Sequence, residues 1–229
     1  MVVLSRISTK TGDLGMTHLG DMSRVAKTDP RIGAVGAVAE TSAAIGLARA
    51  AGLPERLDAW AGTLQQELFD LGADLATPLP GGPDQDQGKA QNRRRARVRR
   101  IGPAEIARLE AQIGDLASEL GPLRSFILPG GPPGAAHLHL AVTVARRAER
   151  EAWSAAAADG IGQKGGLAQN ALVYLNRLSD LLFQMARAAG GPAELWQPDQ
   201  AHSGVSEREG PASIQDNSPA EAPRESTSK

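Results

Sequence analysis

Hydrophobic side chains recur at three- and four-residue intervals in five stretches of the chain, and this spacing predicts five amphipathic helices. The first is expected to begin at Asp29-Pro30, where aspartate can cap a helix and proline suits its first turn. It should end near Ala51. The second helix is expected to begin at Leu53-Pro54-Glu55, and the third to run from Pro103 to about Leu120. The fourth should follow the turn at 129–133, and the fifth should run from about Leu167 to Ala189. Long helices with short or moderate connections indicate an all-α bundle.

Composition narrows the classes of protein. The 229 residues suffice for one domain with a substantial core, and aromatic residues make up only 3%. The absence of cysteine excludes disulfides, thiolate nucleophiles and cysteine-bound metals, and it fits a reducing cytoplasm. No stretch approaches the roughly 20 apolar residues of a membrane helix, and no secretory signal is evident at the N-terminus. A formal net charge of -1 provides no basic field for nucleic acid.

Two regions fall outside the helical pattern. Residues 77–102 form a long segment rich in proline, glycine, aspartate and glutamine, which ends in an arginine run: Arg93, Arg94, Arg95, Arg97, Arg99 and Arg100. A solvated surface loop is the favoured interpretation, and contact with nucleic acid or an acidic partner is the alternative. The segment 199–229 has almost no apolar residues and is predicted to be a disordered tail, which leaves 1–198 as the domain.

A cluster of glycines and hydrogen-bond donors lies near the start of the chain. Thr9 to Thr17 reads Thr-Lys-Thr-Gly-Asp-Leu-Gly-Met-Thr. Gly12 and Gly15 permit positive φ, so successive N–H groups could turn inward and bind an anion, with Lys10 adding a positive charge. The pattern differs from the P-loop of nucleotide-binding proteins, and a plain polar arm is the alternative.

Charged side chains gather on the last two predicted helices. Arg146, Glu149 and Arg150 share one helix face, with Arg147 alongside, so the carboxylate could orient guanidinium groups toward phosphate. A solvated charged face is the alternative. On the last helix Asn176 and Asp180 lie one turn apart among apolar residues, which predicts a buried polar network there.

Taken in order, these motifs resemble those of the propanediol-utilisation-type (PduO-type) ATP:corrinoid adenosyltransferases. The similarity covers about residues 5 to 198. The segments that carry it are Thr9–Thr17, Arg24–Arg31, Ser125–Gly131, Arg146–Arg150, Tyr174–Phe183 and Leu195–Pro198. Each segment alone is weak, and their common order and spacing make the resemblance specific.

The resemblance implies a fold and a reaction. The fold would be a five-helix bundle of the cobalamin adenosyltransferase type, ferritin-like in outline, assembled as a homotrimer with active sites between subunits. Such proteins transfer the 5′-deoxyadenosyl group of ATP to cob(I)alamin, which gives adenosylcobalamin and releases triphosphate. ATP, Mg²⁺ and cobalamin would be bound, and a reductase and a cobalamin-dependent acceptor enzyme would be partners.

The resemblance also implies roles for individual residues. The N-terminal arm, residues 1–28, would cradle the triphosphate through Thr9, Lys10, Thr11, Gly12, Thr17 and Lys27, with Mg²⁺ sharing the charge. Arg146 and Arg150 would clamp phosphates beside Arg147, oriented by Glu149, and Asn176 would hydrogen-bond the nucleotide. Phe126 would press on the lower face of the corrin, so Phe126 and Arg146 are the expected catalytic residues. No protein ligand for a metal is identified.

Two positions depart from the family pattern. Ala39 stands where most members have aspartate, and Val142 where most have arginine; in the family these two residues form a salt bridge between subunits. Losing one partner of a buried pair costs about 3–5 kcal/mol, whereas replacing both with apolar groups can be neutral. An active transferase is therefore the first hypothesis. A non-catalytic paralogue that binds ATP or adenosylcobalamin as carrier, sensor or partner subunit is the second. A nucleic-acid-binding bundle that uses Arg93–Arg100 is the third.

Overall fold

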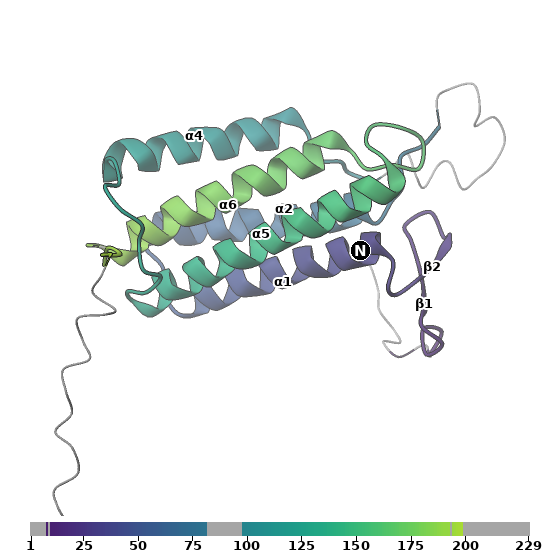
Figure 1. Cartoon of the computed structure of the whole chain (residues 1–229), viewed down its shortest axis with the longest axis horizontal. Helices are drawn as coiled ribbons and strands as arrows, with labels where there is room; N and C mark the ends of the chain where they lie inside the picture. Colours follow the sequence, from purple (N-terminus) through teal and green to yellow (C-terminus); the bar gives the residue numbers. More distant parts are fainter. Residues whose placement is uncertain (1–7, 9, 82–97, 193, 199–229) are drawn as a thin grey trace, which may run out of the picture. The chain divides into compact units, whose positions relative to one another are not determined.

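The computed structural model describes residues 8, 10–81, 98–192 and 194–198. These residues form five helices and one short hairpin (Figure 1): β1 (Met16–His18), β2 (Arg24–Ala26), α1 (Pro30–Ala50), α2 (Glu55–Leu75), α4 (Pro103–Leu120), α5 (Pro133–Asp159) and α6 (Gln169–Gly190). The all-α prediction is confirmed. The chain divides into two units after Leu195, and the contacts below lie within the first. No helix of the described ranges is long and apolar enough to cross a membrane.

The predicted helix boundaries are close to the observed ones. At the start of α1 the Asp29 carboxylate accepts a hydrogen bond from the Arg31 N–H at 2.8 Å, as the capping pattern predicts. Helix α6 begins at Gln169, later than the predicted Leu167. The backbone of Leu167 instead donates to the Gly160 carbonyl at 2.9 Å and accepts from Gly162 at 2.9 Å, and these bonds hold it in the preceding loop.

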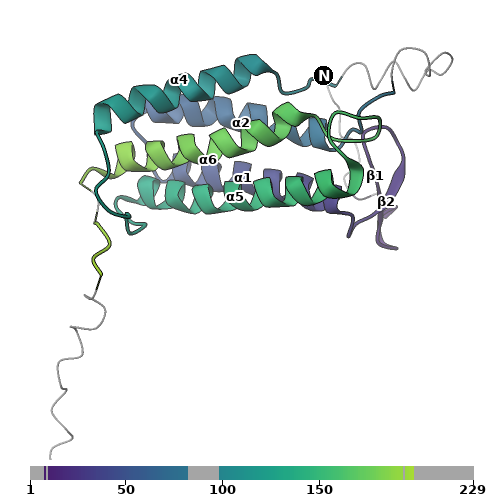
Figure 2. The same ribbon diagram turned by 45° about the horizontal axis from the view of Figure 1, so that its top comes forward.

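The helices pack around a core of leucine and alanine. Helix α1 lies against α2 and α5, while α6 contacts α5, α4 and α2 (Figures 1 and 2). The buried side of α5 is built largely from alanines with no exposed surface, among them Ala141, Ala145, Ala148 and Ala152. Because a methyl group projects little from the backbone, these alanines let neighbouring helices approach α5 closely.

A buried polar network does involve α6, but the residues differ from those predicted. Tyr174 is fully buried and donates its hydroxyl proton to Glu67 on α2 at 2.7 Å, and Arg108 on α4 pairs with the same carboxylate. Burial, together with the Glu67 carboxylate, raises the pKa of Tyr174 well above 10. Asn176 and Asp180 are exposed, so the prediction that they form a buried network is wrong.

The N-terminal hairpin was not predicted, because each strand has only three residues and carries no clear alternation. Strands β1 and β2 pair antiparallel, with Thr17 opposite Val25. Gly20 in the turn donates to the carbonyl of Ala76 at 2.8 Å, and Leu19 is buried. The hairpin is thereby fixed to the bundle where α1 begins and α2 ends.

Arg31 joins several elements at this end of the bundle. Its side chain is only 2% exposed, and it donates to Asp159 Oδ2 at 2.8 Å and to the carbonyls of Leu75 and Gly165 at 2.8 and 2.7 Å. One guanidinium thus connects the start of α1 with the ends of α2 and α5 and with the loop before α6. Each of its three side-chain nitrogens has an acceptor, which offsets the cost of burying the cation.

The described part of the arginine run is structural. Arg99 pairs with Asp70 at 3.1 Å and with Glu105 at 2.8 Å. Arg100 pairs with the buried Asp74 at 2.5 Å and donates to the Thr77 carbonyl at 2.8 Å. The expectation of a solvated run is wrong for Arg100, which is 23% exposed and holds the end of the long loop against α2. Arg99 also pairs with α2, but its side chain is 62% exposed, as a solvated run predicts. Arg93, Arg94, Arg95 and Arg97 lie outside the described residues, as does the segment 199–229.

Candidate functional site

The N-terminal arm forms a tight turn before and after β1. Lys10 adopts φ 57°, a left-handed conformation that is uncommon outside glycine and often marks a functional site. Gly15 donates to the Gly12 carbonyl at 3.2 Å, and Lys27 donates to the Gly15 carbonyl at 2.8 Å. A methyl group placed on Gly12 would lie 3.1 Å from Lys27 Nζ, so the ammonium group packs directly over the glycine backbone.

The arm therefore brings together several of the predicted anion-binding residues. Gly12 and Lys27 are in contact, Lys10 and Thr11 lie in the same exposed turn, and Thr17 follows in β1. Thr9 lies outside the described residues. An accumulation of amide donors, hydroxyls and two ammonium groups in one turn suits a polyphosphate.

A second polar cluster lies across α5 and α6. Asn176 Nδ2 donates to Glu149 Oε1 at 3.2 Å, and the Asn176 side-chain carbonyl accepts from Arg177 at 2.8 Å. Arg146 and Arg150 are exposed on the same side of α5. The predicted pairing of Glu149 with these arginines is not found in the described residues; Glu149 orients Asn176 instead.

The arginines of this region differ in their partners. Arg147 pairs with Glu40 on α1, so it lies apart from the cluster, and Arg177 pairs with Glu110 on α4 at 2.9 Å. Within the described chain, Arg146 and Arg150 form no ion pair, and the one bond recorded for Arg150 is a long one of 3.4 Å to the Arg146 carbonyl. Two guanidinium groups with unused donors therefore face solvent side by side, an arrangement that suits an anionic ligand.

Beside this cluster lies a groove of about 610 Å³, between α5 and the segment that precedes it. Its walls are mainly apolar, and among the described lining residues only Arg146 carries a permanent charge. Phe126 also lines the groove and is 79% exposed, which is unusual for so large an apolar side chain. The two expected catalytic residues are therefore brought to one groove.

His139 also lines the groove and was not identified from the sequence. It is 9% exposed, and its ring meets Phe183 edge to face with centroids 6.2 Å apart. Burial lowers the pKa of His139, so the imidazole is neutral at physiological pH. The sequence spacing could have identified it, because His139, Val142 and Arg146 lie at i, i+3 and i+7 and therefore share one side of α5.

The arm and the α5–α6 cluster are far apart within one chain. Asp159, which Arg31 ties to the arm end of the bundle, lies nine residues beyond Arg150 and 13 residues beyond Arg146 on α5. At 1.5 Å per residue these separations are about 14 Å and about 20 Å along the helix axis. No hydrogen bond or ion pair between described residues joins 10–27 to the α5–α6 cluster, so one chain does not assemble both halves of the predicted site.

Comparison with known proteins decides between the candidate classes. Residues 7–189 match the sequence model of a family described as cobalamin adenosyltransferase. The chain belongs to this family. The match covers the arm, the groove and the α5–α6 cluster, and it confirms the resemblance drawn from the sequence motifs.

Relatives with assigned names support the same assignment. The corrinoid adenosyltransferase of Mycobacterium leprae is 45% identical over 197 residues, which span 85% of this chain and 97% of that protein. The corrinoid adenosyltransferase of Mycobacterium tuberculosis is 44% identical over 199 residues, 86% of this chain and 95% of that one. The corrinoid adenosyltransferase PduO of Salmonella typhimurium is 38% identical over 187 residues, 82% of this chain and 50% of its own length.

Solved structures of PduO-type adenosyltransferases share the fold. A phenylalanine-to-alanine variant of the PduO-type ATP:corrinoid adenosyltransferase from Lactobacillus reuteri, complexed with cobalamin and ATP, has a TM-score of 0.69 at 30% identity. The match covers 84% of this chain and 99% of that structure. An arginine-to-lysine variant complexed with ATP gives a TM-score of 0.68 at 30% identity, over 83% of this chain and 100% of that one.

The two positions expected to depart from the family pattern, Ala39 and Val142, lie on different surfaces of the chain. Val142 is 4% exposed and forms part of the wall of the groove beside Phe126. Ala39 lines a separate, largely apolar hollow of about 440 Å³ between α1 and α2, where Phe69 is 81% exposed. Neither replacement leaves a charged side chain in an apolar wall.

Proposed function

We propose that this protein transfers the 5′-deoxyadenosyl group of ATP to cob(I)alamin, which yields adenosylcobalamin and inorganic triphosphate. The observation that carries the proposal is the groove, which combines an exposed Phe126 with Arg146 in a chain of the cobalamin adenosyltransferase family. The groove suits a flat, largely apolar macrocycle, and the neighbouring guanidinium groups suit a phosphate chain.

The reaction needs little acid–base chemistry from the protein. The cobalt(I) of the substrate corrinoid attacks the ribose 5′ carbon, the bond from this carbon to the phosphate oxygen breaks, and triphosphate leaves with the electron pair. The nucleophile belongs to the substrate, so the protein contributes positioning and charge stabilisation. This accounts for a site built mainly from arginine, lysine and amide groups, in which Ser125, the one serine among the described lining residues of the groove, needs no role as a nucleophile.

We assign Phe126 to the corrin. Its exposed ring would lie against the lower face of the macrocycle and exclude an axial ligand from the cobalt, which makes cobalt(II) easier to reduce. The apolar wall that includes Val142 would cover the edge of the corrin and keep water away from the reduced metal.

We assign Arg146 and Arg150 to the triphosphate and Asn176 to the nucleotide. The two guanidinium groups have no carboxylate partner among described residues, so binding phosphate would cost no existing ion pair. Glu149 holds the Asn176 amide at 3.2 Å and thereby fixes its orientation. Arg147, paired with Glu40, would act at longer range through its charge.

The arm would bind the same triphosphate from the other side through Thr9, Lys10, Thr11, Gly12, Thr17 and Lys27. The described residues contain no group of three or more histidine, aspartate and glutamate side chains that could hold a metal ion. The donors that fit Mg²⁺ are therefore the phosphate oxygens of ATP itself, and the ion would share the charge of the leaving group.

A homotrimer would reconcile the two distant halves of the site. The arm of one copy would meet the α5–α6 cluster of the next, because about 14–20 Å along α5 separates Arg150 and Arg146 from the arm end of the bundle within a chain. Co-expression of two variants tests this arrangement. Lys27→Ala and Arg146→Ala chains are each expected to be inactive alone. A mixed trimer should regain activity, because some interfaces then combine an intact arm from one chain with an intact α5–α6 cluster from another. Failure to regain activity in a mixed assembly would contradict a shared site.

The cellular setting follows from the chemistry. Cobalt(I) is strongly reducing, so we propose a cytoplasmic protein that works with a reductase and passes its product to a cobalamin-dependent enzyme. The domain would comprise residues 1–198, with 199–229 as a tail.

Anaerobic turnover tests the proposed function. Cob(I)alamin and Mg-ATP are mixed with the protein, adenosylcobalamin is followed by absorbance, and triphosphate is quantified. One triphosphate per adenosylcobalamin, at a rate far above the protein-free reaction, is expected. Tight binding of ATP and cobalamin by a folded preparation without turnover would instead favour the non-catalytic carrier.

A further inference from the structure

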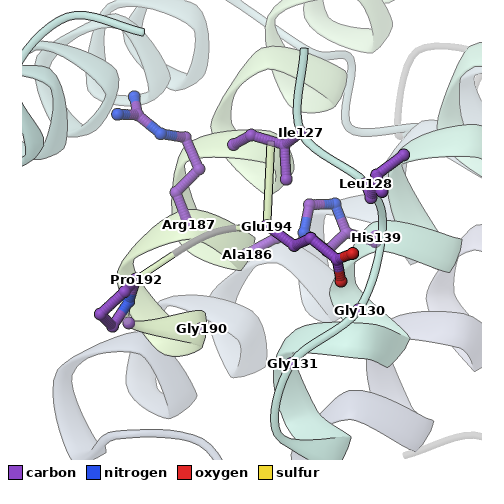
Figure 3. A pocket seen from close by; sticks show the side chains of 11 residues that line it. Ile127, Leu128, Gly130, Gly131, His139, Ala186, Arg187, Gly190, Pro192 and Glu194 are labelled. Atoms are coloured by element: carbon purple, nitrogen blue, oxygen red, sulfur yellow. The ribbon is translucent and has the colours of Figure 1, made fainter. Parts of the chain in front are cut away.

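A second hollow adjoins the groove that we assign to the corrin (Figure 3). It encloses about 220 Å³ between the 127–131 segment, His139 on α5, the end of α6 and the turn that leads to Leu195. Ile127 and His139 line both hollows, so the two are neighbours. Backbone pairing of Ile127 with Leu195, and a 2.9 Å bond from the Leu128 N–H to the Glu194 carbonyl, hold its walls together.

Two polar side chains face this hollow without a partner. His139 is 9% exposed, and its ring has no hydrogen bond within the described chain. The neutral imidazole offers one N–H donor and one acceptor nitrogen. Glu194, an exposed residue, lines the same hollow and forms no ion pair among described residues. Figure 3 shows its carboxylate among the side chains of the hollow. A buried polar group without a protein partner is expected to find one in water or in a ligand.

The charge of the hollow limits what it can bind. The Arg187 guanidinium keeps its positive charge, because its recorded partners are the neutral Gln184 at 2.8 Å and the Gly121 carbonyl at 3.1 Å, but in Figure 3 it points away from the Glu194 carboxylate. The C-terminal end of α6, near Gly190, contributes the negative end of the helix dipole. Around the Glu194 carboxylate the hollow therefore disfavours carboxylate and phosphate and favours a neutral hydrogen-bond donor.

We propose that this hollow, the amide pocket, receives a propionamide side chain of the corrin bound in the adjoining groove. A primary carboxamide has both functions the pocket calls for: its NH₂ group donates to Glu194 and its carbonyl accepts from the His139 N–H. The pocket lies behind Ile127, so the longer propionamide arms suit it better than the acetamides. This assignment rests on the proposed function, and it makes Glu194 a specificity residue that admits an amide and repels the corresponding acid.

The b-, d- and e-monocarboxylic acids of cobalamin test the assignment, because each replaces one propionamide with a carboxylate. Their binding to the ATP-loaded protein is measured by equilibrium dialysis beside that of cobalamin. One of the three is expected to bind the unmodified protein roughly tenfold to a hundredfold more weakly than cobalamin, the range for a lost hydrogen bond to a charged group. Glu194→Gln should reduce this penalty to less than about threefold, because glutamine can donate to a carboxylate.

Two further variants sharpen the test. Glu194→Lys should reverse the preference, so that the same acid binds better than cobalamin. Glu55→Gln, at the exposed start of α2, serves as the matched control and should leave the penalty unchanged. Equal binding of all three acids, or a penalty that persists in Glu194→Gln, would overturn the assignment while turnover of cobalamin continued. Absence of cobalamin binding would remove the proposed function itself, and the assignment with it.

Discussion

Replacing Arg146 tests the proposed site most directly, because the side chain is exposed and has no ion pair in the described structure. Arg146→Ala removes a forked donor from the groove and disturbs no recorded contact of the side chain. The stability of the fold should therefore change by no more than about 0.5 kcal/mol, as is usual for surface substitutions. Any large loss of activity would then report on the reaction rather than on folding.

The expected loss follows from the chemistry of the leaving group. A preorganised donor aimed at charge that develops in the transition state contributes about 2.7–4 kcal/mol, which corresponds to a roughly 10²- to 10³-fold fall in kcat. Arg146 is the one permanently charged residue among those described around the groove, and its neighbour Arg150 does not line the groove. We therefore expect a loss near the upper end, with Arg146→Lys intermediate because lysine keeps the charge and loses the fork.

The assay is the anaerobic formation of adenosylcobalamin, with kcat and KM for ATP measured separately. Arg56→Ala is the matched control, because Arg56 is an exposed arginine on α2, and neither it nor its partner Glu119 lines the groove. The control should keep full activity and lose little stability, because exposed ion pairs contribute little. An Arg146→Ala protein with unchanged kcat/KM would refute the role assigned to this arginine.

Three other outcomes are expected. Arg31→Met should lower the free energy of unfolding in urea titrations, by about 1–3 kcal/mol for each buried acceptor left without its donor, because the carbonyls of Leu75 and Gly165 lose their hydrogen bonds. Arg56→Met should cost much less, because its ion pair is exposed, and equal effects would contradict the anchoring role of Arg31. Arg99 and backbone donors lower the pKa of Glu105 in the folded protein. The stability that Glu105 contributes is therefore present above its unfolded pKa and is lost as pH falls through its folded pKa. Glu105→Gln should flatten the acid side of a plot of Tm against pH, and an unchanged plot would refute this prediction. Removal of 199–229 should leave Tm and kcat unchanged, and a fall in either would show that the segment packs.

Local signals explain why so much of the fold could be predicted. The Asp29-Pro30 cap, the 3.6-residue periodicity and the glycine-proline turns each act within a few residues, and they placed all five described helices. The hairpin at Met16–His18 escaped prediction because it is held by tertiary contacts such as the bond from Gly20 to Ala76, which have no sequence signature.

The polar residues show where sequence reasoning fails for a physical reason. Glu67, Arg108 and Tyr174 come from three helices, so their network exists only once α2, α4 and α6 are packed together. Conversely, Asn176 and Asp180 have the composition of a buried network and lie at the surface. One-dimensional spacing identifies which residues share a helix face, and it does not reveal whether that face is covered.

The difference between local sequence patterns and contacts that form only on folding also applies to the candidate site. Phe126 and Arg146 were expected from motifs, and their meeting in one groove depends on the segment 122–129 folding back beside α5, which the bridge from Ile127 to Leu195 stabilises. That fold-back also creates the amide pocket, whose walls come from residues 127–131, from α5 and from the end of α6. No single segment of the chain supplies all the walls of this pocket, so a local sequence pattern cannot predict it. In the proposed function, the groove would bind the plane of the macrocycle and the amide pocket would bind one of its side chains, so both parts of the substrate would contribute to selectivity.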